Sequence, residues 1–229
     1  MLDFNKAFYD LVNCLQPLYD AQEAAAIAHE VLFHITGQDK LQRLLNKDTY
    51  LTASQLQQYD RMHANLIKGR PLQYVLGHAW FMGHSYIVNE SVLIPRPETE
   101  ELVQWIIDDN KQADGILSVL DIGTGSGCIS VSLKLALPNI AITTCDISKD
   151  ALRIAEENAE TADAHVRFVQ IDFLNKEHWD KLGEFDIIVS NPPYIPESEK
   201  EQIHQNVKDL EPTKALFVPN DDPLLFYRN

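Results

Sequence analysis

Cysteine and long apolar stretches are both scarce in this sequence. Its 229 residues include three cysteines, Cys14, Cys128 and Cys145, which are odd in number and lack the spacing of metal ligands. No apolar run approaches the roughly 18–20 residues that a membrane-spanning helix needs. The opening residues, MLDFNKAFYD, contain two aspartates where a secretory signal would be apolar. The sequence therefore excludes a disulfide scaffold and a helical membrane protein, offers no metal site, and indicates a cytoplasmic protein with reduced thiols.

Positive charge is also scarce, with 19 basic against 34 acidic residues and a net charge of −15. Residues 1–70 hold 7 basic and 8 acidic residues, so nearly all of the excess of acidic over basic residues lies in residues 71–229. Contacts from Lys and Arg to phosphates dominate affinity for duplex nucleic acid. The charge distribution therefore argues against stable nucleic-acid binding, although it does not exclude a local basic groove. Hydrophobic residues make up 45% of the chain, enough to build a core and to exclude general disorder.

Residues 1–70 follow helical periodicity. Apolar residues recur at the spacing of one buried helical face in residues 4–15, 24–35 and 56–67. Asp20 with Glu23 and Thr52 with Gln55 have the spacing of capping boxes ahead of the last two stretches. We therefore predict a small N-terminal helical bundle over residues 1–70.

Residues 71–97 change character. Short groups of strand-forming residues occur at 74–76, 80–81, 86–88 and 92–94, and glycines or a turn signal separate them. This pattern predicts a β-hairpin linker in which 92–94 is a short return strand. A helix is expected to follow from about Pro97 to Asn110.

Residues 98–229 alternate between strands and helices. The expected strands are 118–120, 140–144, 166–171 and 185–189, with helices at about 126–137 and 148–160. Short strands separated by single helices predict an α/β fold with a parallel, Rossmann-like sheet. Doubly wound sheets usually have five or more strands, whereas four are visible here and residues 224–229 read as the opening turns of another helix. We therefore expect this domain to be incomplete at its C-terminus.

A glycine-rich loop follows the first of these strands. Residues 121–127 read Asp-Ile-Gly-Thr-Gly-Ser-Gly, directly before a helix, and glycines there let the backbone approach a ligand closely. Asp146 ends the next strand, 19 residues past Gly127, where a carboxylate can accept hydrogen bonds from a ribose diol. Gly127 comes one residue early for a dinucleotide fingerprint, and Cys128 takes the slot of its third glycine. The pattern predicts a nucleoside-type cofactor.

The fourth strand ends in Asn191-Pro192-Pro193-Tyr194. Ligands bind at the carboxyl ends of strands in open α/β sheets, and the two prolines stiffen the backbone there. An amide nitrogen is a poor nucleophile because its lone pair is delocalised. The Asn191 side-chain oxygen and the Pro192 carbonyl can each accept one of its N–H groups, while Tyr194 stacks on the planar group. This arrangement favours methylation of an amino group by positioning and electrostatics.

Together with Ile94-Pro95-Arg96-Pro97-Glu98-Thr99-Glu100, these two motifs resemble the HemK/PrmC family. Its members are S-adenosylmethionine-dependent protein-(glutamine-N5) methyltransferases that act on peptide-chain release factors. The resemblance covers nearly the whole chain and implies a class I methyltransferase core behind an N-terminal bundle that grips the release factor. The implied target is the glutamine of a Gly-Gly-Gln motif in class 1 release factors.

The resemblance also implies a role for each motif residue. Those that would surround the methionine part of the cofactor are Gly123, Thr124, Gly125, Ser126 and Gly127. Asp146 would hold the ribose, and Asp172 with Phe173 would flank the adenine. Asn191 would contact both cofactor and substrate, and the glutamine pocket would be completed by Pro192, Pro193 and Tyr194. The implied catalytic residues are Asn191, Pro192 and Tyr194, whereas Arg96 and Thr99 would border the site without being catalytic.

Four other functions remain open on the sequence. Enzymes that methylate adenine N6 share Asn-Pro-Pro-Tyr, and a ribosomal protein is an alternative glutamine-bearing target. A nicotinamide-dependent dehydrogenase fits the glycine loop less well. Relatives continue with a fifth strand and a final hairpin that this chain lacks, so a module that binds a release factor without turnover is the non-enzymatic alternative.

Overall fold

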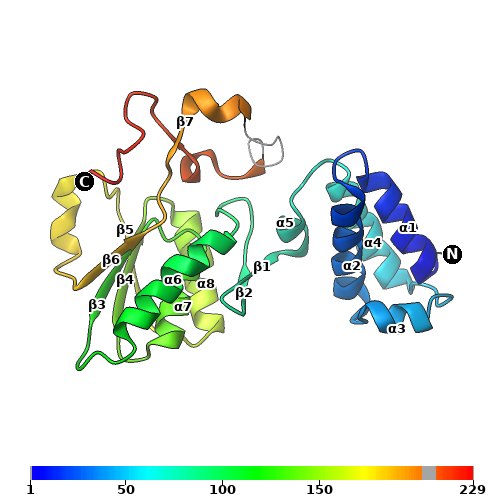
Figure 1. Ribbon diagram of the computed structural model, residues 1–229, viewed down its shortest axis with the longest axis horizontal. Coiled ribbons are helices and arrows are strands. Elements are labelled where there is room, and N and C mark those ends of the chain that lie inside the picture. Colours follow the sequence, from blue (N-terminus) through cyan, green and yellow to red (C-terminus); the bar gives the residue numbers. More distant parts are fainter. Residues whose placement is uncertain (1, 203–209, 229) are drawn as a thin grey trace. The chain divides into compact units, whose positions relative to one another are not determined.

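The computed structural model describes residues 2–202 and 210–228, which divide into two compact units (Figure 1). We call residues 1–76 the bundle unit and residues 77–229 the sheet unit. The division falls after Leu76, six residues beyond the end that the sequence indicates for the helical bundle. None of the described helices is long and apolar enough to cross a membrane.

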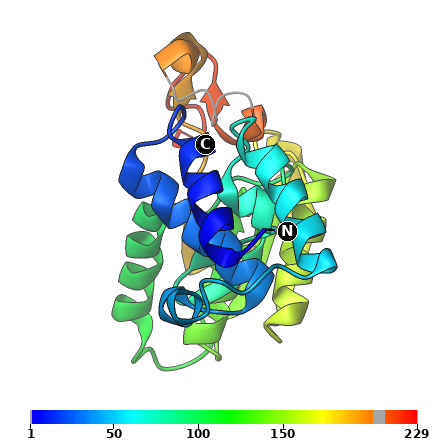
Figure 2. The same cartoon turned by 90° about the vertical axis from the view of Figure 1, so that its right-hand side faces the viewer.

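The described part of the bundle unit is built from helices, with one isolated β-bridge between Asp3 and Tyr50. The helices are α1 (Phe4–Leu15), α2 (Ala21–Thr36), α3 (Lys40–Leu45), α4 (Ala53–Leu66) and α5 (Leu72–Leu76). Helices α1 and α2 run side by side (Figures 1 and 2). The Asp20 carboxylate caps α2 by accepting from the N–H groups of Gln22 and Glu23, and Thr52 with Gln55 forms a complete capping box on α4. The expected helical bundle is confirmed.

The prediction of strands at residues 74–76 and 92–94 is wrong. Residues 72–76 form helix α5 because Leu72, Val75 and Leu76 share a helical spacing and pack against the bundle core. Aromatic and β-branched residues in so short a run do not distinguish a strand from a buried helical turn. Residues 92–94 pair with no strand in the described part of the chain and instead line the cavity described below.

The hairpin itself is confirmed. Strands β1 (His78–Phe81) and β2 (His84–Ile87) pair antiparallel, with Ala79 opposite Tyr86. Its two-residue turn has positive φ at both Met82 (50°) and Gly83 (76°), as a type I′ turn requires.

The core of the sheet unit is a four-stranded parallel sheet, as predicted. Its strands are β3 (Ser118–Ile122), β4 (Ala141–Asp146), β5 (Val166–Gln170) and β6 (Ile187–Ser190), in the order β5-β4-β3-β6. The chain moves outward from β3 to β5 and returns to the far side of β3 as β6. Strand order therefore reverses between β3 and β6, and ligands bind at the carboxyl end of such a switch point.

Helices cover one face of this sheet, and a 3-10 helix covers the other (Figure 1). The first layer contains α6 (Pro97–Asn110), α7 (Cys128–Ala136) and α8 (Lys149–Thr161). On the opposite face η1 (Lys176–Lys181) and the residue after it pack Trp179 and Leu182 against Leu120 and Ile122 of β3. The central strands β3 and β4 are thus buried on both faces. The edge strands β5 and β6 keep exposed positions, such as Ile188, which is 64% exposed.

Beyond β6 the chain forms short elements that the sequence did not indicate. Two-residue strands β7 (Ile195–Pro196) and β8 (Phe217–Val218) pair in parallel, next to η2 (Glu197–Gln202) and η3 (Thr213–Ala215). At residues 224–228, where helical turns were expected, the chain forms a turn closed by the Arg228 N–H donating to the Leu224 carbonyl at 3.2 Å.

Candidate functional site

A cavity of about 710 Å³ lies at the carboxyl ends of β3 to β6, within the sheet unit. Its volume falls within the roughly 300–1,000 Å³ of small-molecule sites. The walls come from residues 91–96, the glycine loop, the ends of β4 and β5, Asn191 and the 211–219 segment, which contains η3 and β8. The cavity thus forms where the strand order predicts a ligand.

The glycine loop presents bare backbone to this cavity. Gly123, Gly125 and Gly127 have φ values of 74°, 54° and 78°, a region that favours glycine. A Cβ at Gly123 or Gly125 would meet nothing within 4 Å, whereas one at Gly127 would lie 3.0 Å from the Ala155 Cβ of α8. The first two glycines therefore leave room for a ligand, and the third permits close packing of α7 against α8.

Beneath the loop lies the buried carboxyl group of Asp121. Its Oδ2 accepts hydrogen bonds from the hydroxyls of Thr124 (2.8 Å) and Thr144 (3.3 Å). Burial raises its pKa to about 6, and the hydroxyl hydrogen bonds oppose this shift. Among the described residues, Asp121 Oδ1 and Ser126 Oγ are buried without a hydrogen-bond partner. Buried polar atoms without partners are rare, and Ser126, which lines the cavity, fits a site that receives a polar ligand.

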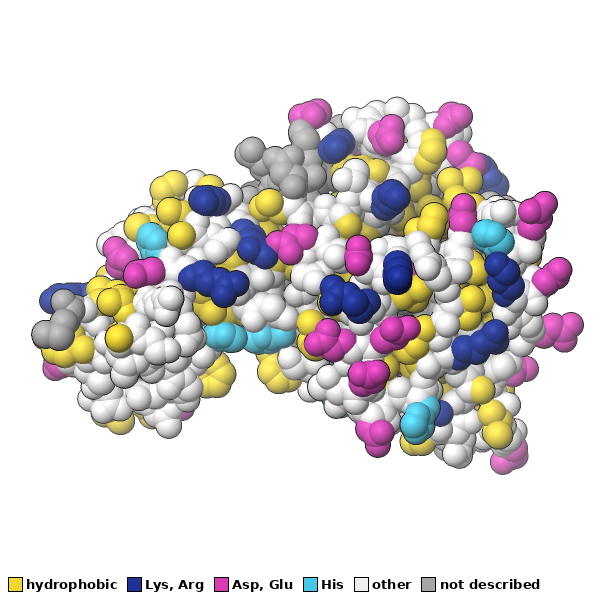
Figure 3. All heavy atoms as spheres, turned by 180° about the vertical axis from the view of Figure 1, so that it is seen from behind, with side chains coloured by type: hydrophobic (Ala, Val, Ile, Leu, Met, Phe, Trp, Pro, Cys, Tyr) yellow, Lys and Arg dark blue, Asp and Glu magenta, His cyan; other side chains and the backbone are white. Residues whose placement is uncertain are grey.

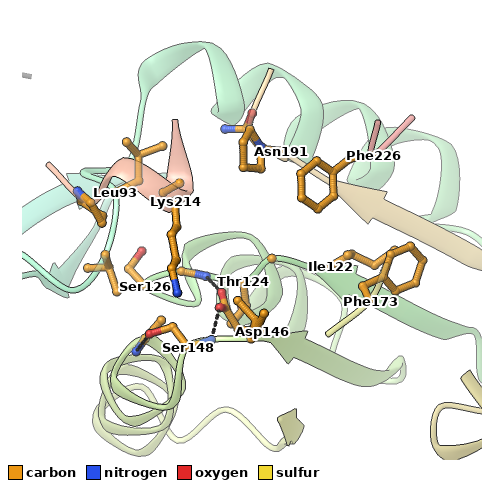
Figure 4. A pocket seen from close by; sticks show the side chains of 18 of the residues that line it. Leu93, Ile122, Thr124, Ser126, Asp146, Ser148, Phe173, Asn191, Lys214 and Phe226 are labelled. Carbon is orange, nitrogen blue, oxygen red and sulfur yellow. Dashed lines mark hydrogen bonds between the residues drawn. The ribbon is translucent and has the colours of Figure 1, made fainter. Parts of the chain in front are cut away.

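Asp146 lies at the end of β4 and lines the cavity (Figure 4). Its Oδ2 accepts from the Gly125 N–H at 3.1 Å, and its Oδ1 accepts from the Ser148 N–H at 2.8 Å. Burial raises the pKa of Asp146, and these backbone donors oppose the rise. A carboxylate has about four acceptor positions, so the group is fixed in place and keeps acceptor capacity for two hydroxyls.

Asp172 and Phe173 follow β5 and also line the cavity. The Phe173 ring stacks on Trp179 with centroids 5.2 Å apart, and the Trp179 indole donates to the Phe173 carbonyl at 2.8 Å. Asp172 accepts from the Leu174 N–H at 3.0 Å. The aromatic wall is therefore held rigidly by a tryptophan that no sequence motif singled out.

Asn191 lies directly after β6 on the cavity wall (Figure 4). Its side-chain nitrogen donates to the hydroxyl of Thr99, a buried residue of α6, at 3.0 Å. Its side-chain oxygen has no partner among the residues that the structure describes. The amide is thus fixed through its nitrogen and keeps a free acceptor.

The structure brings most of the predicted site residues together, but not all of them. On the cavity wall lie Gly123, Thr124, Gly125, Ser126, Asp146, Asp172, Phe173, Asn191 and Pro193. Gly127 instead lies behind the loop as the N-cap of α7, Pro192 is buried, and Tyr194 is 58% exposed outside the lining.

Two structural supports of the site depend on contacts that the sequence did not indicate. Asn158 of α8 holds the glycine loop by donating to the Ser126 carbonyl at 2.8 Å, and it also bonds both backbone groups of Ile87. Arg96 donates to both carboxylate oxygens of Glu211, at 2.7 and 2.8 Å, and Glu211 has only 2% of its side chain exposed. This ion pair fixes the start of the 211–219 segment, which brings Lys214 to the cavity.

One group of metal-ligand side chains lies outside the cavity, in the bundle unit. The candidate ligand atoms of Asp10, Cys14 and His63 lie within 4.8 Å of one another. The Tyr59 hydroxyl already donates to Asp10 at 2.7 Å, so a hydrogen bond within the bundle accounts for that carboxylate.

Two family models match the chain: the PrmC N-terminal domain over residues 12–77 and the methyltransferase small domain over residues 102–217. Among the curated relatives, a release factor glutamine methyltransferase of Flavobacterium psychrophilum is 42% identical over 219 residues, which cover 95% of this chain and 76% of the relative. The enzyme of that name from Bacteroides thetaiotaomicron is 43% identical, with 93% and 76% covered. That of Enterococcus faecalis is 39% identical, with 96% and 78% covered.

Proposed function

Because the chain belongs to the release factor glutamine methyltransferase family, we propose that it methylates the side-chain nitrogen (N5) of the glutamine in the Gly-Gly-Gln motif of class 1 release factors. The family and the Rossmann-like methyltransferase fold are those that the motifs predicted. The observation that carries the proposal is Asn191, held by Thr99 and left with a free acceptor on the cavity wall. A substrate that acts in translation implies a cytoplasmic location.

The cofactor is S-adenosylmethionine, which supplies an electrophilic methyl group when bound. The cavity fits it, because bare glycine backbone and the unpartnered Ser126 hydroxyl suit a polar amino-acid part. Asp146, Phe173 and Asp172 line the cavity. Asp146 would accept from the ribose hydroxyls, and Phe173 with Asp172 would flank the adenine. Gly127 contributes indirectly, because it allows α7 to begin close behind the loop.

The chain's own residues activate the substrate by holding its amide. Asn191 Oδ1 and the Pro192 carbonyl each accept one N–H of the glutamine side chain, which increases electron density on its nitrogen. The hydrogen bond from Asn191 to Thr99 fixes the first acceptor before the substrate arrives. Pro193 completes the pocket on the cavity wall, and the exposed Tyr194 ring is available to stack on the amide plane. Preorganised acceptors of this kind lower the barrier without a general base.

Adenine-N6 methylation is the second candidate, since the same four residues suit an exocyclic amine. The excess of acidic residues in residues 71–229 weighs against it. On the face shown in Figure 3, acidic and basic side chains are interspersed rather than gathered by sign. The match of residues 12–77 to the PrmC N-terminal domain also favours a protein substrate. We therefore propose that release factors are the partners and that no stable complex with nucleic acid forms.

The test compares Asn191→Ala and Asn191→Asp with the unaltered chain, using a release factor and an adenine-containing oligonucleotide as methyl acceptors. We expect methyl transfer to the release factor to fall at least about 100-fold in both variants, the loss typical of removing a preorganised polar contact. Asn139→Ala removes an exposed asparagine far from the cavity lining and is the matched control. Undiminished transfer by Asn191→Ala, or methylation of the oligonucleotide instead, would overturn the proposal.

A further inference from the structure

Lys214 is a cavity residue that no motif accounts for. It lies in η3 within the 211–219 segment, and its side chain extends from that segment into the cavity toward the glycine loop (Figure 4). The position is fixed on both sides, because Glu211 is bound by Arg96 and Phe217 pairs with Ile195. The 211–219 segment therefore places the positively charged Lys214 side chain in the cavity from a fixed backbone position.

The charges around the cavity leave Lys214 unneutralised. Three carboxylates line the cavity, from Asp146, Asp150 and Asp172, against two cations, Arg96 and Lys214. Arg96 is already bound to Glu211 through two contacts. Lys214 has no ion pair or hydrogen bond within the described residues. An anionic ligand group entering this cavity meets net negative charge, and Lys214 is the cation free to compensate it.

The place of Lys214 along the cavity identifies which part of a ligand it meets. In Figure 4, Phe173 lies on one side of Asp146, whereas Lys214 and Ser126 lie on the other. Under the proposed function, adenine is at Phe173 and ribose is at Asp146. The remaining end, above the glycine loop, receives the amino-acid part of the cofactor, whose carboxylate carries a negative charge.

We propose that Lys214 binds the α-carboxylate of S-adenosylmethionine and of its product S-adenosylhomocysteine. This assignment rests on the proposed function, and it adds a binding residue outside the motifs. A charge-assisted hydrogen bond from an ammonium group to a carboxylate is stronger than a neutral one. Here it also offsets the repulsion from the three cavity carboxylates, and backbone N–H groups of the loop alone carry no full charge.

The experiment measures binding by calorimetry with two ligands, S-adenosylhomocysteine and its decarboxylated analogue, which keeps the amine, thioether, ribose and adenine. The chains are unaltered, Lys214→Ala, Lys214→Arg and Lys111→Ala, the last a control that removes the same charge from an exposed site. We expect Lys214→Ala to weaken the binding of S-adenosylhomocysteine about tenfold, the size of one charge-assisted contact at an exposed site. Its affinity for the decarboxylated analogue should stay the same or rise, because a cation beside the ligand amine is gone. Lys214→Arg should restore most of the loss, and Lys111→Ala should change neither affinity.

Equal weakening of both ligands by Lys214→Ala, or no weakening of either, would overturn the role of Lys214 while leaving the methyltransferase function in place. A chain that binds S-adenosylhomocysteine in none of its forms, yet melts cooperatively, would overturn the proposed function and the role of Lys214 together. The salt dependence gives a second readout: the affinity of the unaltered chain for S-adenosylhomocysteine should fall with added salt more steeply than that of Lys214→Ala.

Discussion

The interiors of the two units differ in chemistry. Among the described residues, the bundle unit buries one charged or polar side chain, Arg43, whereas the sheet unit buries ten. Burying a polar group costs free energy unless it is hydrogen-bonded. Even Arg43 satisfies this condition, by donating to the Gln38 carbonyl and contacting His29. The bundle unit is thus stabilised almost wholly by apolar packing, whereas the sheet unit buries polar side chains, of which Thr99, Thr124 and Ser126 line the cavity.

The polar interior of the sheet unit is not spread evenly. Asp121, Thr124, Ser126 and Thr144 lie in or beneath the glycine loop, and Thr99 holds Asn191. Two polar atoms in this group remain without a partner in the part of the chain that the structure describes. The sheet unit therefore differs from the bundle unit in placing buried polar side chains at the glycine loop and beside Asn191.

The largest effect on stability is expected in the bundle unit. Leu32→Ala removes a side chain with no exposed surface and should lower the free energy of unfolding of this unit by about 2–5 kcal/mol. All three tryptophans, Trp80, Trp105 and Trp179, lie in the sheet unit, so helical circular dichroism should detect the change while affinity for S-adenosylhomocysteine stays the same. Leu44→Ala, at a position 65% exposed, is the control. A matching loss of affinity for S-adenosylhomocysteine in Leu32→Ala would contradict the inference that cofactor binding depends on the sheet unit alone.

A pH-dependent stability is expected from Asp121. Its pKa rises from 3.8 to about 6 on folding, so the folded state favours the protonated form. The resulting stabilisation is complete below about pH 4 and is lost as pH rises through about 6, a change of about 3 kcal/mol. Relative to Asp121→Asn, which cannot titrate, the unaltered chain should lose that much free energy of unfolding between pH 4 and pH 7. Urea titrations followed by tryptophan fluorescence measure the difference, and parallel pH profiles would contradict it.

The close contact of Gly127 with α8 should appear as a stability loss in the sheet unit. Gly127→Ala places a Cβ 3.0 Å from Ala155 at a φ of 78° and should cost about 1–3 kcal/mol. Adding Ala155→Gly removes the 3.0 Å contact with the Ala155 Cβ, whereas the 3.2 Å contact with the Ala155 Cα and the backbone strain remain, so it should restore part of the loss. Full restoration would show that the backbone strain costs no stability. No restoration would show that the contact with the Ala155 side chain costs none.

A smaller effect on turnover is expected at Thr99. Thr99→Val keeps the shape of the side chain and removes the hydroxyl that holds Asn191, so methyl transfer should fall about tenfold, as for the loss of one hydrogen bond. Thr99→Ser keeps the hydroxyl and should retain most of the rate. If Thr99→Val keeps its affinity for S-adenosylhomocysteine and its melting temperature, the loss of rate comes from the lost positioning of Asn191 and not from a loss of stability. If the rate falls only in proportion to stability, the positioning role is wrong.

The sequence predicted the local features of the site well. The glycine loop, Asp146 and Asn191 follow apolar strands directly, so the strand order alone brings their positions to one edge of the sheet. The strand predictions at residues 74–76 and 92–94 were wrong because apolar runs this short show no period that distinguishes a strand from a helical turn or a loop.

Contacts between distant segments were beyond the reach of the sequence. Arg96 meets Glu211 across 115 positions, and Thr99 meets Asn191 across 92. No periodicity or turn chemistry links such pairs. Lys214 lies in the 211–219 segment, which the first of these contacts and the pairing of Phe217 with Ile195 hold in place, so its position at the cavity emerged from the structure alone.

The most direct measurement is tandem mass spectrometry of a release factor after incubation with this chain and S-adenosylmethionine. If the cavity brings a methyl donor and a glutamine amide together at Asn191, the peptide that contains Gly-Gly-Gln gains one methyl group on its glutamine side chain. The same incubation with Asn191→Ala leaves that glutamine unmodified. A chain that binds S-adenosylhomocysteine but never modifies this glutamine, or that methylates another residue instead, would contradict the assignment.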